Sequence, residues 1–290
     1  MARLNQRYFN KRGRNSFIDF FQRSIINWII LFNFIAYFII FLMIQFFGLE
    51  KTLSLVALQA NGFFQGRVWT LFTSMFAHVE LWHLLANMFS LYFIGNFVEK
   101  LIGRKRLLVF YLISGIFAGL FYVFLSYYFG SFNLGSRLFG NPETYAVGAS
   151  GAVFALLGLL AVLIPRYPVY LIIGPIIALI MDSVLPIFVS SQSFLSFFST
   201  AVTIYIFICI FSLISGPGSF LRKLSIPIRM KLWVAPIIAI IPLILIGLVV
   251  SLPIGNSAHL GGLILGLAYA FYLKNKYKKK TSLIVDYFSE

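Results

Sequence analysis

The stretch from residue 25 to residue 49 reads IINWIILFNFIAYFIIFLMIQFFGL and carries no charged side chain. A helix needs about 20 predominantly apolar residues to cross the roughly 30 Å hydrocarbon core of a bilayer. This stretch is long enough to do so, and it predicts a transmembrane helix.

The composition of the whole chain points the same way. Of 290 residues, 60% are hydrophobic, 18% are aromatic and only 11% are charged. A soluble domain carries about 25% charged residues, so this chain has too few charges to cover a surface exposed to water. We therefore predict an integral, multi-pass membrane protein surrounded by the lipid bilayer.

Seven more apolar stretches approach the length of a span. The fifth of the eight contains three prolines and Asp182, so residues 168–215 either cross the membrane twice or dip in and return. Both alternatives give an even number of spans. We predict an all-α polytopic fold with spans near residues 25–49, 82–98, 107–128, 146–165, 168–189, 194–215, 232–251 and 258–273.

The basic residues are distributed as membrane topology requires. There are 23 Lys and Arg against 8 Asp and Glu, a formal net charge of +15 that could also suggest nucleic-acid binding. Nearly all of these basic residues fall on the cytoplasmic side when the N-terminus is placed there, as the positive-inside rule requires. We predict no nucleic-acid partner, basic cytoplasmic tails at residues 1–24 and 274–290, and a membrane domain at residues 25–273.

The sequence predicts neither a metal site nor a cofactor. The single cysteine, Cys209, lies in an apolar stretch and has no second cysteine with which to pair. His78 and His83 are five residues apart, whereas zinc proteases use the spacing His-Glu-x-x-His. Asp182 has no second membrane-embedded aspartate with which to share a proton, as an aspartyl protease needs.

Ser150 and His259 stand at the predicted outer ends of two spans. Ser150 lies in the sequence Val-Gly-Ala-Ser-Gly-Ala, and His259 follows Asn-Ser-Ala. Glycines beside a membrane-embedded serine most often indicate close helix packing, and a lone histidine there is more often an interfacial hydrogen-bonding group. A histidine at the same depth as a glycine-flanked serine also fits nucleophilic catalysis.

Small residues indicate that the fourth and last spans pack closely and in parallel. They recur at helical spacing, which lets two helix backbones approach each other. The two faces comprise Ala258, Gly262, Gly266 and Ala270 on the last span, and Gly151, Ala155 and Gly158 on the fourth.

His83 and Asn87 are four residues apart and therefore lie on one face of the second span. Polar side chains on an apolar helix must meet a polar partner or water. Donors in such a place can stabilise the oxyanion of an acyl-transfer reaction, where one preorganised donor contributes about 3 kcal/mol. His78 belongs to the preceding loop or to another helix face.

Three motifs in this order resemble the rhomboid family of intramembrane serine proteases. They are His78-x4-His83-x3-Asn87, then Gly148-Ala149-Ser150-Gly151, then Ala258-His259-x2-Gly262-x3-Gly266. The resemblance implies a six-helix core, here with two additional transmembrane or re-entrant segments within about residues 168–231. It also implies cleavage of transmembrane protein substrates near the outer membrane face.

The resemblance implies a role for each site residue. Ser150 would be the nucleophile and His259 the general base of a dyad that lacks a carboxylate. His83, Asn87 and the backbone N–H of Ser150 would stabilise the oxyanion. The supporting residues would be His78, Gly148, Gly151, Phe154, Gly262 and Gly266, with Phe154 where family members often carry a tyrosine packed against the catalytic histidine.

Two features depart from the family pattern. The first outside loop reads Arg67-Val-Trp69, whereas family members often have Trp-Arg, so the loop-stabilising role usually given to that arginine is open here. Three apolar stretches also separate the serine and histidine spans, where the family core needs one. Any of the three could take that place, and the natural candidates are 168–189, directly after the serine span, and 232–251, directly before the histidine span.

Other functions fit the same residues. A transporter or channel would line a permeation path with them, and a non-catalytic rhomboid-like protein would only bind membrane helices. We predict a rhomboid-type serine endopeptidase, located most simply in a prokaryotic plasma membrane.

Overall fold

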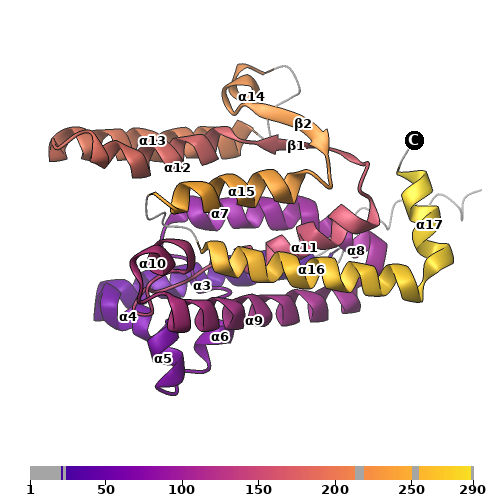
Figure 1. The fold of residues 1–290 in the computed structure, drawn as a ribbon, viewed down its shortest axis with the longest axis horizontal. Helices are drawn as coiled ribbons and strands as arrows, with labels where there is room; N and C mark the ends of the chain where they lie inside the picture. The colour runs from indigo at the N-terminus through magenta and orange to yellow at the C-terminus, as the bar shows by residue number, and fades with distance from the viewer. Residues whose placement is uncertain (1–20, 22–23, 213–218, 250–254, 289–290) are drawn as a thin grey trace, which may run out of the picture.

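The structure is a computed structural model that describes residues 21, 24–212, 219–249 and 255–288. These residues form a bundle of helices with one two-stranded sheet at its edge (Figure 1). The predicted tail at residues 1–24 lies outside the described residues except for Phe21 and Ser24. The bundle confirms the predicted helical, multi-pass membrane fold.

Six helical segments form the core, and each corresponds to one predicted apolar stretch. The second segment runs without a break through a π-helical turn at Leu91–Gly95. The core comprises α3 (Ile25–Phe47), α7 (Leu81–Ser90) with α8 (Asn96–Ile102), α9 (Arg104–Phe129), α11 (Ser150–Leu163), α15 (Ala235–Gly247) and α16 (Asn256–Lys276).

Several helices of the described part of the chain can cross a membrane by length and composition. The four that meet both criteria are Ile25–Phe47, Leu81–Ile102, Arg104–Phe129 and Gln192–Ser212. α16 is also long, but its polar first turn and its glycines make it less apolar. Since these helices expose many large apolar side chains, lipid is the medium that suits their outer faces.

The fourth predicted span is shorter than the sequence suggested. Residues 146–149 are not helical, and α11 begins at Ser150 and has 14 residues. Gly148 has a φ of +118°, which an L-residue rarely adopts, so the helix cannot extend back through it. Ser150 therefore stands in the first turn of the helix.

Residues 168–189, predicted as one span, fold as a strand and a short helix. Strand β1 (Pro168–Ile172) pairs antiparallel with β2 (Pro227–Lys231), and Pro168 lies opposite Lys231. Val, Tyr and Ile in β1 favour a strand, while a proline in the first turn of α12 (Gly174–Val184) suits a helix start. Within the described residues, the regular structure is therefore helical except for this ribbon and one isolated bridge between Leu58 and Ala146.

The additional segments form a hairpin beside the core. α12 and α13 (Gln192–Ser212) pack against each other, and α14 (Phe220–Leu224) leads back to β2. Figure 1 shows this hairpin on the outer side of α15. The apolar contact with the core joins Val202, Ile206 and Ile210 of α13 to Trp82, Leu85, Ala86 and Phe89 of α7.

α15 completes the core. It contacts both α11 and α16, whereas α12 packs on α13, and α13 packs on α7. Of the two stretches that the sequence left as alternatives, 232–251 thus takes the place directly before the histidine helix. The two segments added to the six-helix core are α12 and α13.

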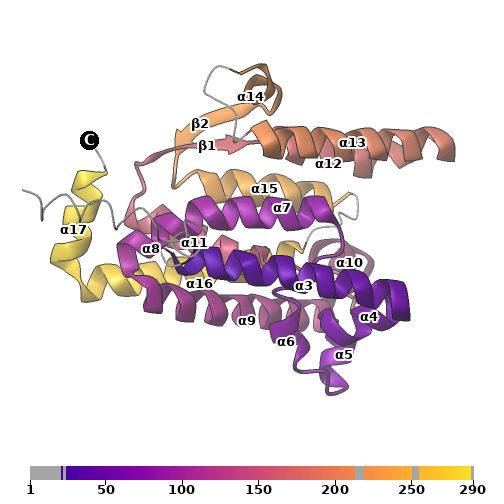
Figure 2. The same cartoon turned by 180° about the vertical axis from the view of Figure 1, so that it is seen from behind.

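Short helices cover one end of the bundle. The apolar connection between α3 and α7 contains α4 (Leu49–Val56), α5 (Ala60–Phe64) and α6 (Thr70–Thr73); α4 lies at that end, and α5 and α6 lie alongside α9 (Figure 2). α10 (Asn133–Phe139), in the connection between α9 and α11, lies at the same end.

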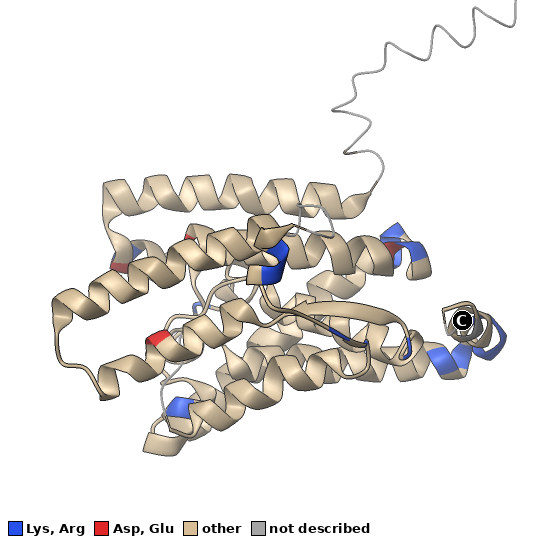
Figure 3. Ribbon diagram, turned by 90° about the horizontal axis from the view of Figure 1, so that it is seen from above, with Lys and Arg blue, Asp and Glu red and all other residues tan. Residues whose placement is uncertain are grey.

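Charged residues are few along the helices and gather toward the opposite end (Figure 3). There the Glu99 carboxylate accepts hydrogen bonds from the Ser24 hydroxyl and the Ile25 backbone N–H, and it pairs with Arg104 at 3.0 Å. Part of the predicted C-terminal tail is helical, as α17 (Lys278–Tyr287). The Phe288 ring after it contacts Phe97, with ring centroids 5.3 Å apart.

Candidate active site

The site begins with the contact between α11 and α16. A Cβ added at Gly262 would overlap the carbonyl oxygen of Gly151, and one at Gly266 would overlap that of Ala155. Both pairs advance by four residues along their helices, so the helices run parallel at backbone contact distance. Only glycine permits this approach, as the small-residue spacing predicts.

This packing brings the first turns of the two helices together. The Oγ atom of Ser150 lies 2.7 Å from Nε2 of His259. The His259 ring stacks on Phe154, with centroids 4.3 Å apart and planes inclined by 17°. The described residues offer Nδ1 of His259 no hydrogen-bond partner. Ser150 and His259 therefore form a pair without a carboxylate behind the imidazole.

His83 and Asn87 lie beside the start of α11. A Cβ added at Gly148 would stand 2.8 Å from Cε1 of His83 and 3.6 Å from Nδ2 of Asn87. The amide of Asn87 donates to the His83 carbonyl at 3.1 Å and is 5% exposed. A glycine at position 148 thus keeps space open between these donors and Ser150.

Hydrogen bonds from neighbouring segments hold the loop that leads to Ser150. The Gly148 N–H donates to the Ser74 carbonyl at 2.8 Å, and Leu58 and Ala146 exchange two backbone hydrogen bonds of 3.0 and 2.7 Å. The hydroxyl of Tyr122 on α9 donates to the Thr144 carbonyl at 2.7 Å. The sequence carries no signal for these anchors, because backbone carbonyls accept hydrogen bonds whatever their side chains.

Arg67 holds the connection between α3 and α7 together although it precedes Trp69 by two residues. Its guanidinium donates to the Ser54 carbonyl at 3.1 Å and to Oε1 of Gln59, and it lies against Gly62. Arg67 therefore bridges parts of the loop that are 13 residues apart. The loop therefore keeps an arginine that cross-links it, although the order of the arginine and the tryptophan departs from the Trp-Arg pattern.

We expect Arg67→Gln to lower the free energy of unfolding by about 1–2 kcal/mol, because charge-assisted hydrogen bonds at a partly exposed site are lost. Thermal unfolding in detergent measures the change. Arg137→Gln is the matched control, since that guanidinium makes one exposed bond of 3.3 Å to the Leu248 carbonyl. Equal unfolding temperatures for the two variants would contradict the bridging role.

His78 is fully buried in the loop before α7, with its ring centroid 5.1 Å from that of His83. Burial, assisted by the nearby His83, lowers the pKa of His78 to about 3. The imidazole of His78 is therefore neutral at physiological pH and packs against the ring of His83. The sequence left this residue between the loop and another helix face, and the structure places it in the loop.

A hydroxyl and an imidazole in contact, beside the buried Asn87 amide and the half-buried His83 imidazole, are the groups that a serine hydrolase uses for acyl transfer. The fold and the site thus define a polytopic membrane protein with a serine–histidine pair in the first turns of two packed helices. Residues 65–216 match the model of the Rhomboid domain. The chain belongs to the rhomboid family.

Curated relatives agree with this assignment. The chain is 31% identical over 135 residues to RHOMBOID-like protein 12, mitochondrial, of Arabidopsis thaliana, covering 46% of this chain and 40% of that protein. It is 30% identical over 119 residues to Rhomboid protease GlpG of Pectobacterium atrosepticum, covering 41% and 37%. Inactive RHOMBOID-like protein 8 of Arabidopsis thaliana is 37% identical over 73 residues, covering 25% and 21%.

The matches have limits that matter for function. The aligned region spans less than half the length of each of these relatives. The domain match includes Ser150 but ends before His259. The relatives come from plants and bacteria, and one is named as mitochondrial, so they give no support to the predicted prokaryotic plasma membrane.

Proposed function

We propose that this chain is an intramembrane serine protease that cleaves transmembrane proteins near the outer membrane face. The observation that carries the proposal is the 2.7 Å separation between Oγ of Ser150 and Nε2 of His259. A weakly acidic hydroxyl becomes nucleophilic when a base stands within hydrogen-bond reach. Membership of the rhomboid family supports the class of substrate.

The proposed reaction begins with attack of Oγ of Ser150 on a substrate carbonyl carbon, while Nε2 of His259 takes the hydroxyl proton. The negative charge that forms on the carbonyl oxygen is stabilised by Asn87, His83 and the Ser150 N–H. His259 then gives its proton to the leaving amine, and water resolves the acyl-enzyme by the same steps.

The stacked Phe154 and the tight α11–α16 contact serve as positioning elements in this proposal. In a catalytic triad, a carboxylate bonded to Nδ1 orients the imidazole. Nδ1 of His259 has no such partner in the described residues, so ring stacking and helix packing orient the imidazole here. A substrate helix has its carbonyls already hydrogen-bonded, so it must unwind before attack. Helix-breaking residues near the cleavage site should accelerate the reaction.

We also propose that both termini face the cytoplasm, with residues 25–273 as one membrane domain. The basic clusters support this orientation through the positive-inside rule. The site then lies toward the outer face, in the half of the bundle that ends at α4 and α10.

The direct test reconstitutes the full chain with a single-span reporter protein and, separately, with a fluorophosphonate probe. We expect reporter fragments, and we expect mass spectrometry to locate the probe on Ser150. A chain that neither cuts the reporter nor takes the probe is a non-catalytic family member, as the relative named inactive illustrates. A probe on another serine would contradict the assignment of the nucleophile.

Replacing Asn87 by alanine should lower the cleavage rate constant about 10²–10³-fold, because one oxyanion donor is removed. Asn96→Ala is the matched control, since Asn96 also donates to a carbonyl four residues back, at 2.7 Å, but this half-buried residue makes its bond at the exposed surface of α8. Steady-state cleavage of the reporter measures both variants. Equal rates would remove Asn87 from the oxyanion site.

A further inference from the structure

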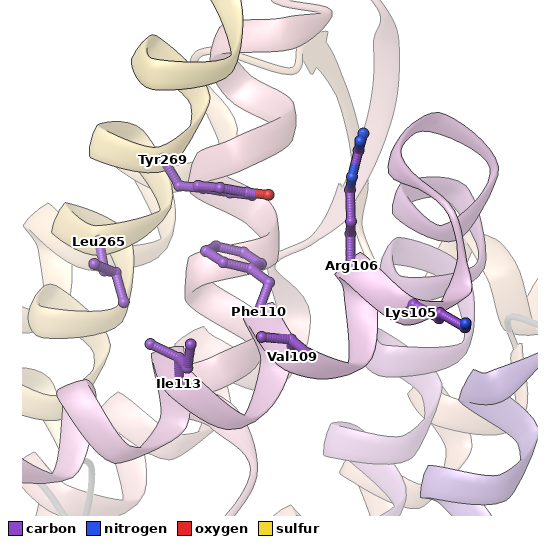
Figure 4. A pocket seen from close by; sticks show the side chains of 7 residues that line it. All are labelled: Lys105, Arg106, Val109, Phe110, Ile113, Leu265 and Tyr269. Carbon is purple, nitrogen blue, oxygen red and sulfur yellow. The ribbon is translucent and has the colours of Figure 1, made fainter. Parts of the chain in front are cut away.

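A groove lies between α9 and α16 at the basic end of the bundle. Its volume is about 350 Å³, and its apolar lining comes from Val109, Phe110 and Ile113 on α9 and from Leu265 on α16 (Figure 4). Val109 and Ile113 are each 55% exposed. Since these helices stand in lipid, this surface faces acyl chains and not water.

The groove has a charged end. Lys105 and Arg106 line it in the first turn of α9, and the apolar residues follow one and two turns later on the same helix face. From Arg106 to Ile113 the helix rises about 10 Å. Along this distance the lining changes from cationic to apolar, as a phospholipid changes from phosphate to acyl chain.

The two cations are available to a ligand. In the described part of the chain the Glu99 carboxylate pairs with Arg104, and no carboxylate lies within 4.0 Å of Lys105 or Arg106. The Arg106 guanidinium stands 5.5 Å from the centre of the Tyr277 ring, near the end of α16. It is therefore held beside the groove without being neutralised.

Tyr269 closes the groove between the two helices. Its ring stacks on Phe110, with centroids 4.6 Å apart and planes inclined by 21°. In Figure 4 its hydroxyl points toward the side where Arg106 stands. The described residues give this hydroxyl no hydrogen-bond partner, so it adds a third donor to the charged end.

We infer that this groove binds an anionic phospholipid, with the phosphate near Lys105, Arg106 and Tyr269 and one acyl chain along Val109 and Ile113. A free phosphate gains nothing from the apolar lining. A zwitterionic lipid carries a cationic group in its headgroup, which Lys105 and Arg106 would repel. The inference is independent of the proposed proteolysis and holds equally for a non-catalytic chain.

The test uses the full chain in a neutral detergent, with phosphatidylglycerol or phosphatidylcholine added, and counts bound lipids by native mass spectrometry. We expect one retained phosphatidylglycerol and no comparable retention of phosphatidylcholine. Lys105→Gln with Arg106→Gln should weaken binding about five-fold for each cation, or roughly 25-fold together. Ile113→Trp, which fills the apolar part, should also displace the lipid.

The control is Lys279→Gln with Lys280→Gln, which removes the same charge from exposed positions on α17. This variant should retain the lipid. Equal losses in the two double variants would show general surface attraction and overturn the site. So would equal retention of the two lipids, or displacement of phosphatidylglycerol by millimolar inorganic phosphate. Unchanged thermal unfolding in phosphatidylcholine excludes misfolding as the cause of a loss.

Discussion

Ser150→Ala is expected to lower reporter cleavage by on the order of 10⁴-fold or more and to abolish fluorophosphonate labelling. The reason is that, within the described residues, the hydroxyl hydrogen-bonded to His259 is that of Ser150, whose Oγ lies 2.7 Å from Nε2. When groups act as one unit, removal of the nucleophile alone costs nearly as much as removal of the whole set. Single-turnover cleavage in proteoliposomes measures the chemical step.

Ser257→Ala is the matched control for this prediction. Ser257 is also buried in the first turn of α16, two residues before His259, but its hydroxyl donates to the Phe139 carbonyl at 3.2 Å. It should keep cleavage within a few-fold of the unchanged chain, with a stability cost of about 1 kcal/mol. Residual cleavage by Ser150→Ala at the level of this control would refute a serine mechanism for the chain.

The sequence was sufficient to locate the core helices and to pair the two site helices. Long uncharged stretches have one stable arrangement in lipid, so residues 25–49 and 107–128 predict α3 and α9 with ends off by a few residues. The parallel contact of α11 and α16 followed from glycine spacing. Gly262 and Gly266 have this signal because only small residues allow backbone contact.

Other features of the fold carry no such signal. β1 starts at Pro168 in a stretch that is as apolar as a membrane span. This stretch forms a strand because it pairs with residues 227–231, nearly 60 positions away. In the sequence, Glu99 is a single acid beside a basic cluster. In the structure it is only 9% exposed, and its carboxylate accepts a hydrogen bond from the backbone N–H of Ile25 at the start of α3. Both depend on contacts between distant segments, which composition and periodicity do not report.

The loop before Ser150 shows a third kind of limit. Gly148 reads equally well as a packing glycine in a helix and as a residue with positive φ, and the structure assigns the second role. The backbone hydrogen bond from Gly148 to Ser74 then determines where α11 begins. The site residues were thus identifiable by type, but the shape of the space around Ser150 was not.

The close α11–α16 contact makes Gly262 the most sensitive packing position of the site. We expect Gly262→Val to lower the thermal unfolding temperature strongly, with a loss of about 3 kcal/mol or more, because its Cβ would overlap the Gly151 carbonyl. The overlapped atom belongs to the backbone, so rotation of a side chain cannot relieve the clash. The helices must separate at the level of Ser150 and His259.

Ala268→Val is the control, since Ala268 lies on the exposed face of the same helix and the added methyl groups enter lipid. Its unfolding temperature and cleavage rate should match those of the unchanged chain. Gly262→Val should also lose cleavage in molecules that remain folded. Oγ of Ser150 lies 2.7 Å from Nε2 of His259, so a further separation of about 1 Å would break their hydrogen bond. A stable, fully active Gly262→Val would mean that α11 and α16 do not meet through this face, and the serine–histidine pairing would fall with it.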